Sequence, residues 1–117
     1  MLSIATGTRI FVATGATDMR KGFDGLQGIV TGVLEQDPLS GHLFLFVNRR
    51  RDKLKILYWD GDGLAIWYRR LEQGTFQMPR IQDDQKAAEI RSDELMMLVR
   101  GIDFDNIHRR KRFAMVS

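Results

Sequence analysis

Acidic side chains are the first candidates for chemistry, because clustered carboxylates hold the divalent metals of nucleases. Asp60 and Asp62 alternate with glycines in the segment DGDG, and Asp18 is a third, distant candidate. Two-metal nucleases need several carboxylates that converge on a water-excluding cavity. Aspartate is also common in Gly-containing turns, where its side chain bonds to nearby backbone N–H groups. We therefore predict a turn at 60–63 and no metal site. A metal-dependent nuclease remains a less favoured alternative.

Histidine, cysteine and glycine patterns support no other reaction. His42 and His108 are the only histidines, neither has a second ligand at metal spacing, and cysteine is absent. Thiol nucleophiles and thiolate metal ligands are thereby excluded, and a zinc site or a Ser-His-Asp triad has little basis. The sequence also contains no G-x-x-x-x-G-K-[ST] phosphate loop. We expect a protein that is not an enzyme, with no cofactor and no small-molecule substrate.

Positive charge is concentrated in two short runs. The formal net charge is only +3, yet half of the 18 Lys and Arg residues lie in these runs. The first run comprises Arg49, Arg50, Arg51, Lys53 and Lys55, and the second comprises Arg109, Arg110, Lys111 and Arg112. Such runs attract nucleic-acid phosphates through counterion release. A solvated loop and a solvated tail would give the same pattern, so both interpretations stay open.

A further pair of cations, Arg20 and Lys21, lies at the expected start of the first helix. Free backbone N–H groups at a helix N-terminus bind phosphate, and two cations would strengthen such a site. In the alternative interpretation Arg20 pairs with Asp24, four residues later on the same helix face. The sequence does not decide between them, and we keep Arg20 and Lys21 as candidate DNA contacts.

Four aromatic residues surround the DGDG turn, namely Tyr58, Trp59, Trp67 and Tyr68. Aromatic rings beside cations can stack on unpaired bases. Most aromatic residues at strand or helix spacing belong to the core. We expect Trp67 and Tyr68 to be buried on a helix, and at most one of Tyr58 and Trp59 to be free.

The elements that must position these residues follow from apolar spacing. Residues 9–14 are β-prone and predict a first strand. A helix is expected over about 19–35, capped by Thr17 or Asp18, with an apolar face of Phe23, Leu26, Val30, Val33 and Leu34. Residues 43–47 and 54–59 are apolar runs that predict two strands, joined by a hairpin loop that presents the first basic run.

The second half of the chain is less regular. Leu64, Trp67, Tyr68 and Leu71 fit helical spacing better than the alternation that Ile66 and Tyr68 also allow, so we predict a helix from 64 to 71, capped by Asp62. Short strands are expected at 75–78 and 87–91. Ser92 is the expected N-cap of a last helix, which ends before Gly101.

Together these elements predict one α+β domain over residues 1–107, followed by a basic tail at 108–117. The expected order is β-α-β-β-α-β-β-α, with a mainly antiparallel sheet of about five short strands packed against three helices. No apolar run approaches the ~20 residues that span a bilayer, and no secretory signal is evident. We expect a cytoplasmic protein with no membrane partner.

Three blocks of the sequence resemble a known family. They are TGATDMRKGFDGL (14–26), DPLSGHLFLFVNRRRDKLKILYWDGDGLAIWYRRLEQGTF (37–76) and SDELMMLVRGIDF (92–104). They look like the TnpB-type accessory protein encoded by the second reading frame of bacterial insertion sequence 66 transposons, although that family usually has Trp in place of Tyr58. The resemblance implies a role in DNA transposition beside a separate transposase, and it implies no catalytic residue.

We therefore predict a non-catalytic accessory protein for DNA transposition that binds DNA, the transposase of the same element, or both. The alternative from another class is a protein-only assembly factor that holds the transposase without touching DNA. An oligomer is possible in either case.

Overall fold

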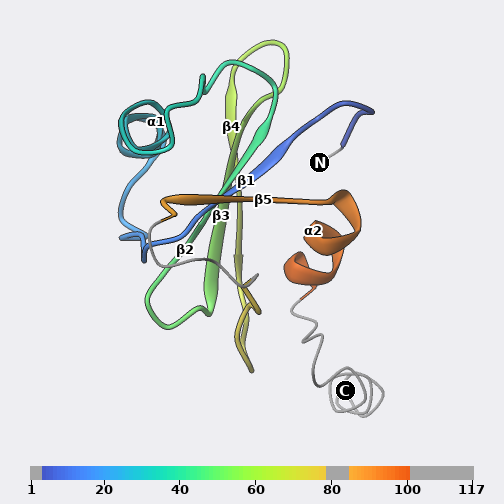
Figure 1. The fold of residues 1–117 in the computed structure, drawn as a ribbon. Coiled ribbons are helices and arrows are strands. Elements are labelled where there is room, and N and C mark those ends of the chain that lie inside the picture. Colours follow the sequence, from blue (N-terminus) through green and yellow to red (C-terminus); the bar gives the residue numbers. More distant parts are fainter. Residues whose placement is uncertain (1–3, 79–84, 101–117) are drawn as a thin grey trace.

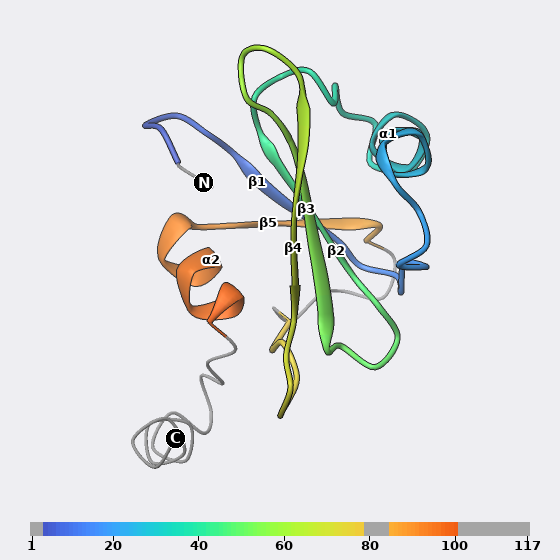
Figure 2. The ribbon, with the colours of Figure 1, turned by 180° about the vertical axis from the view of Figure 1, so that it is seen from behind.

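A mixed β-sheet lies between two helices, one on each face, in the computed structural model (Figures 1 and 2). The structure describes residues 4–78 and 85–100. In these residues the element order is β1 (Ile10–Ala13), α1 (Phe23–Gly32), β2 (Leu43–Val47), β3 (Lys53–Trp59), β4 (Leu64–Arg70), β5 (Ala87–Ile90) and α2 (Ser92–Val99).

The five strands lie in the order β4-β3-β2-β1-β5. β1 and β2 are parallel and are joined through α1, whereas all other neighbouring pairs are antiparallel. The central strands β1 and β2 are apolar and buried along their whole length, as expected for strands covered on both faces. The parallel pair brings the carboxyl ends of β1 and β2 to one edge of the sheet.

Each face of the sheet has its own apolar core, because successive side chains of a strand point to opposite faces. The α2 face buries Ile10, Val12, Leu43, Leu45, Val47, Leu54, Ile56, Phe76, Ile90, Leu95, Leu98 and Val99. The α1 face buries Phe11, Ala13, Leu26, Val30, Leu34, Phe44, Phe46 and Leu57. The sheet is therefore the middle layer of three.

The predicted arrangement of three helices was wrong, and the described residues contain two. Residues 64–71 were expected to form a helix, but Leu64–Arg70 is strand β4, paired with all seven residues of β3. A helix here would leave one side of β3 without backbone partners. The sheet is also mixed, since β1 and β2 run parallel.

A tight turn, not a helix cap, precedes β4. The Asp60 carboxylate accepts the backbone N–H groups of Asp62 and Gly63, both at 3.0 Å. The Asp60 N–H in turn donates to the Gly63 carbonyl, and Gly61 has φ of 104°, which glycine adopts without strain. The predicted turn is confirmed, but Asp60 organises it and Asp62 caps no helix.

Phe76 follows β4 without forming a strand, contrary to the strand expected at 75–78. Its side chain is completely buried in the α2-side core. The backbone N–H of Phe76 donates to the Arg51 carbonyl at 2.6 Å, which holds this segment against the loop between β2 and β3.

The helix ends also differ from expectation. α1 begins at Phe23 and ends at Gly32, and neither Thr17 nor Asp18 caps it. It buries Leu26 and Val30, and Leu34 just beyond its end is also buried, whereas Phe23 is 47% exposed and Val33, after the helix, is 44% exposed. Its apolar face is therefore narrower than the sequence suggested.

α2 begins at Ser92, with Arg91 and not Ser92 in the N-cap position. The Glu94 carboxylate accepts the Arg91 N–H at 2.9 Å, which satisfies a backbone donor at the helix start. At the other end, the guanidinium of Arg69 donates to the Val99 carbonyl at 2.6 Å, so β4 is fastened to the C-terminus of α2.

Candidate nucleic-acid interface

The two basic segments 20–21 and 49–53 meet at the edge where β1 and β2 end. Each follows one of these parallel strands, so each leaves the sheet at the same edge. The Thr17 N–H donates to the Val47 carbonyl at 2.8 Å and fixes the two segments side by side. Residues about thirty positions apart in the sequence thus form one surface.

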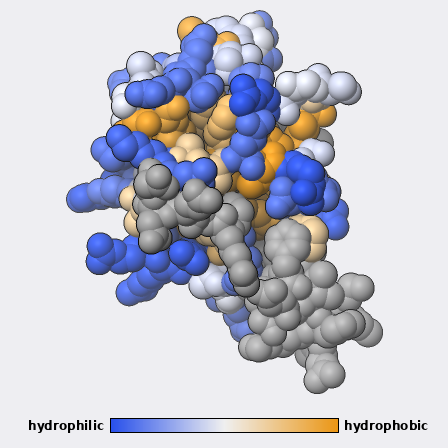
Figure 3. Space-filling model, in the orientation of Figure 1, coloured by the Kyte–Doolittle hydropathy of each residue, from blue (hydrophilic) through white to orange (hydrophobic). Residues whose placement is uncertain are grey.

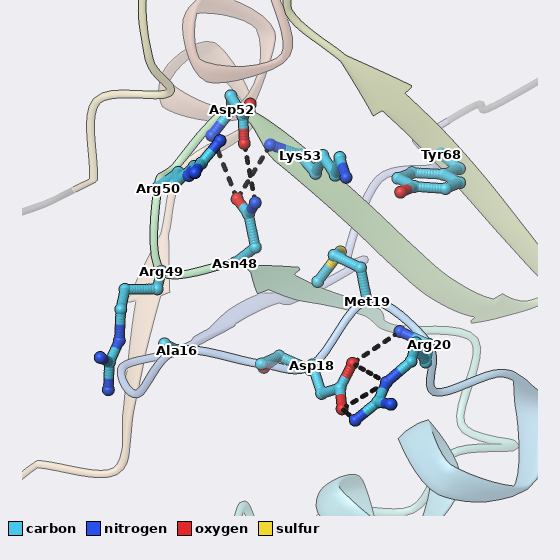
Figure 4. Close-up of a pocket in the computed structure, with 11 residues that line it drawn as sticks. Ala16, Asp18, Met19, Arg20, Asn48, Arg49, Arg50, Asp52, Lys53 and Tyr68 are labelled. Carbon is cyan, nitrogen blue, oxygen red and sulfur yellow. Dashed lines mark hydrogen bonds and ion pairs between the residues drawn. The ribbon is translucent and has the colours of Figure 1, made fainter.

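This surface is an open groove with a volume of about 640 Å³. We call it the basic groove (Figure 4), and it is lined by Ala16, Thr17, Asp18, Met19, Arg20, Asn48, Arg49, Arg50, Asp52, Lys53 and Tyr68. The same corner of the molecule is covered by hydrophilic side chains, at the lower left of Figure 3. Among the groove's side chains four are cationic and two are carboxylates.

Arg20 neutralises one of the two carboxylates. Its guanidinium forms a bidentate ion pair with Asp18, from Nη2 to Oδ2 at 2.7 Å and from Nε to Oδ1 at 3.1 Å, and the backbone N–H of Arg20 donates to the same carboxylate. These hydrogen bonds and the positive charge lower the pKa of Asp18 to about 2. Arg20 therefore does not pair with Asp24, and both members of the actual pair remain in contact with solvent.

Asn48 binds the second carboxylate and shapes the loop that carries the arginines. Its amide donates to Asp52 at 2.7 Å, and its oxygen accepts the N–H groups of Asp52 and Lys53. The hydrogen bond from Asn48 is the main reason that the pKa of Asp52 lies below its usual range. Asp52 is thus held as a carboxylate inside the loop.

Arg49, Arg50 and Lys53 are the cations that this arrangement leaves available. None of them forms an ion pair with another residue in the two ranges that the structure describes. Arg49 and Arg50 are exposed at the loop, and Lys53 is half-buried at the start of β3. Arg51 is also exposed but does not line the basic groove.

Lys55 has a different environment from the rest of its run. Its side chain points to the α1 face, is only 8% exposed, and donates from Nζ to the carbonyls of Met19 and Lys21 at 2.7 and 2.8 Å. The ammonium also lies 4.8 Å from the centre of the Tyr68 ring. It therefore fastens the segment before α1 to the sheet, and we leave it out of the proposed contact surface.

Asn48 and Asp52 were not identified as site residues from the sequence, and Tyr68 was assigned to the wrong element. It was expected to be buried on a helix, but it lies on strand β4 with 50% of its surface exposed. The alternation of Leu64, Ile66 and Tyr68 was the signal that could have placed Tyr68 on a strand.

The remaining predicted DNA contacts do not line the groove. Lys21 is exposed beside it, whereas Arg109, Arg110, Lys111 and Arg112 lie outside the described residues.

The residues first considered for catalysis do not converge. Asp60 is engaged in its turn, and Asp18 is paired with Arg20. His42 accepts the Arg9 N–H through Nδ1 at 3.0 Å. Within residues 4–78 and 85–100, no group of three His, Cys, Asp or Glu residues could hold a metal ion. The same ranges contain no helix long and apolar enough to cross a membrane.

Sequence comparison gives the same family as the three resembling blocks. The family model of IS66 Orf2-like proteins matches residues 8–109. Two similar proteins come from Sinorhizobium fredii. One is named uncharacterized protein y4jC and is 36% identical over 94% of this chain and 92% of its own length. The other is named uncharacterized protein y4hO and is 38% identical over 89% of each chain. No solved structure matches. The chain belongs to the IS66 Orf2-like family, whose members are accessory proteins of insertion-sequence transposition.

Proposed function

We propose that this protein serves transposition by binding DNA through the basic groove, without catalysing a reaction itself. The observation that carries the proposal is the meeting of segments 16–20 and 48–53 at one edge of the sheet. Arg49, Arg50 and Lys53 there have no ion-pair partner among the described residues, so their charges are available to phosphates. Phosphate contacts supply most of the affinity of sequence-independent DNA binding.

Bonding of the nearby carboxylates supports a binding role over a catalytic one. Asp18 and Asp52 face the groove, but each is occupied by a neighbouring Arg20 or Asn48 side chain. A two-metal nuclease needs converging carboxylates that are free to hold its ions. The available groups of the groove are cations, and cations attract the DNA backbone without cleaving it.

The decisive experiment measures DNA affinity as a function of salt concentration. We expect the logarithm of the affinity to fall linearly with the logarithm of the salt concentration. Because each neutralised phosphate contributes about −0.9 to that slope, the double variant Arg49→Ala/Arg50→Ala should flatten it by about 1.8 on duplex DNA. The weakening should be nearly the same for unrelated sequences.

A matched control removes the same charge elsewhere. Arg9 precedes β1 and Arg91 follows β5, so both lie at the end of these strands that is away from the basic groove. They form exposed ion pairs with Glu89 and Asp93. The variant Arg9→Ala/Arg91→Ala should keep the parent slope. If Arg49→Ala/Arg50→Ala also keeps the parent slope and affinity, the basic groove is not the DNA contact. Transposase binding without any salt-dependent DNA affinity would favour the protein-only assembly factor.

The basic tail Arg109–Arg112 belongs to the same proposal as a second phosphate contact. Its four cations are close in sequence, which favours counterion release. Truncation after Ile107 should therefore lower the affinity for DNA or for the transposase. Unchanged binding to both partners would remove the tail from the proposal.

A further inference from the structure

An exposed aromatic ring lies among the cations of the basic groove. Tyr68 is 50% exposed, although large aromatic side chains are normally buried. It projects from β4 on the α1 face, directly opposite Lys55 in the strand register. Figure 4 shows it at the end of the groove, beyond Lys53 and Met19. The sheet thus presents a flat apolar surface where the loop presents positive charge.

The position of this ring is fixed by its neighbour. The Lys55 ammonium lies 4.8 Å from the ring centre, and the ammonium is itself held by the carbonyls of Met19 and Lys21. A cation over one face of the ring is an attractive contact, and it restrains the side chain from rotating freely. Tyr68 is therefore held in place before any ligand binds.

A fixed, exposed ring beside cations is suited to an unpaired base. A base within a duplex has both faces covered by its stacked neighbours, so it cannot lie on a protein ring. An unpaired base has an open face, and proteins that bind single strands combine aromatic stacking with a positively charged groove. The groove volume of about 640 Å³ is in the range of sites for small ligands.

We propose that the basic groove binds single-stranded DNA, with an unpaired base stacked on Tyr68 and the neighbouring phosphates on Arg49, Arg50 and Lys53. This inference rests on the proposed DNA-binding function and specifies the form of the DNA. Stacking requires a π-face but no particular base, so binding should tolerate changes in sequence.

The test compares a labelled oligothymidylate with a duplex of the same length, each titrated by fluorescence anisotropy at the same series of salt concentrations. The parent should bind the single strand more tightly. Tyr68→Leu keeps an apolar side chain on the strand but removes the ring, and it should weaken single-strand binding by roughly 5- to 150-fold. It should leave the salt slope unchanged, because no charge is lost. Tyr68→Phe keeps the ring and should keep the parent affinity.

Phe23 provides the matched control, since it is an aromatic residue with 47% exposure that does not line the groove. Phe23→Leu should bind both DNAs like the parent. Melting temperatures are measured for every variant, and Tyr68→Ile, with its higher strand propensity, replaces Tyr68→Leu if the latter does not fold.

Two results would overturn the inference while leaving DNA binding intact. One is salt-dependent binding that Arg49→Ala/Arg50→Ala weakens but the Tyr68 variants do not change. The other is tighter binding of the duplex by the parent. By contrast, a parent protein that binds neither DNA with salt-dependent affinity would refute the proposed function itself.

Discussion

Replacement of Lys55 by methionine distinguishes a structural side chain from a DNA contact. Lys55 belongs by sequence to the basic run, but in the structure its ammonium is buried against the carbonyls of Met19 and Lys21. Methionine has a similar length and an apolar stem, so Lys55→Met keeps most of the packing and removes the two hydrogen bonds.

The expected loss of stability follows from these contacts. Leaving a buried acceptor without its donor costs about 1–3 kcal/mol. Two carbonyls lose their donor, but their segment is near the surface, so water can replace part of the lost bonding. Removal of the buried ammonium also removes the free-energy cost of its desolvation, which reduces the loss of stability further. We therefore expect a net loss of about 2 kcal/mol. In a domain of about 100 residues this lowers the melting temperature by roughly 8–16 °C.

Thermal unfolding and the salt dependence of DNA binding are measured together on the same variants. Lys53→Met is the control, because Lys53 projects from the same face of β3 but donates no side-chain hydrogen bond to any described residue. Lys55→Met should lower the melting temperature and keep the salt slope. Lys53→Met should keep the melting temperature and flatten the slope, by about 0.9 on duplex DNA and about 0.7 on a single strand. A Lys55→Met protein with the parent melting temperature and a flatter slope would refute the reasoning.

Four further predictions concern the groove, the turn and the core. Asp18→Asn removes a negative charge and releases Arg20, so DNA affinity should rise and the salt slope should steepen. In the parent, Arg20 holds the pKa of Asp18 at about 2, so the contribution of this pair to stability is complete above the ordinary carboxyl pKa of 3.8 and is lost as the pH falls from there to about 2. An NMR titration of Asp18 checks this window, and Arg20→Gln should raise the pKa back toward 3.8. Asp60→Ala should lower the melting temperature more than Asp62→Ala, since only Asp60 accepts two backbone N–H groups, and both variants should leave transposition intact. Phe76→Ala should reduce the free energy of unfolding in urea by about 3–5 kcal/mol, and a loss below ~1 kcal/mol would contradict its burial in the core.

The central strands and the last helix could be predicted from the sequence because local pattern and tertiary structure agree there. Residues 43–47 are apolar without interruption, as a strand covered on both faces should be. At 64–71 the two disagree, since Leu64, Trp67 and Leu71 fit helical spacing, whereas the structure is a strand. Pairing with β3 across the turn at 60–63 decides in favour of the strand, and the apolar spacing within 64–71 does not contain this information.

The chemistry of the basic groove was partly predictable, but its assembly was not. Both basic segments could be identified from composition, and the loop position of Arg49 and Arg50 was expected. These segments are brought together by the parallel direction of β1 and β2 and by the hydrogen bond from the Thr17 N–H to the Val47 carbonyl. Neither feature can be recognised from the local sequence. The burial of Lys55 was equally inaccessible, because its acceptors Met19 and Lys21 are more than thirty residues away.

The assembly of the groove from distant segments has a thermodynamic consequence. In an unfolded chain segments 16–20 and 48–53 are separated, so the groove exists only in the native state. A ligand that binds only the native state shifts the folding equilibrium toward it, by about 2.7 kcal/mol at a ligand concentration 100 times its Kd. Occupancy by DNA would therefore slow proteolysis of this accessory protein, and its abundance in a cell would follow the supply of its own ligand.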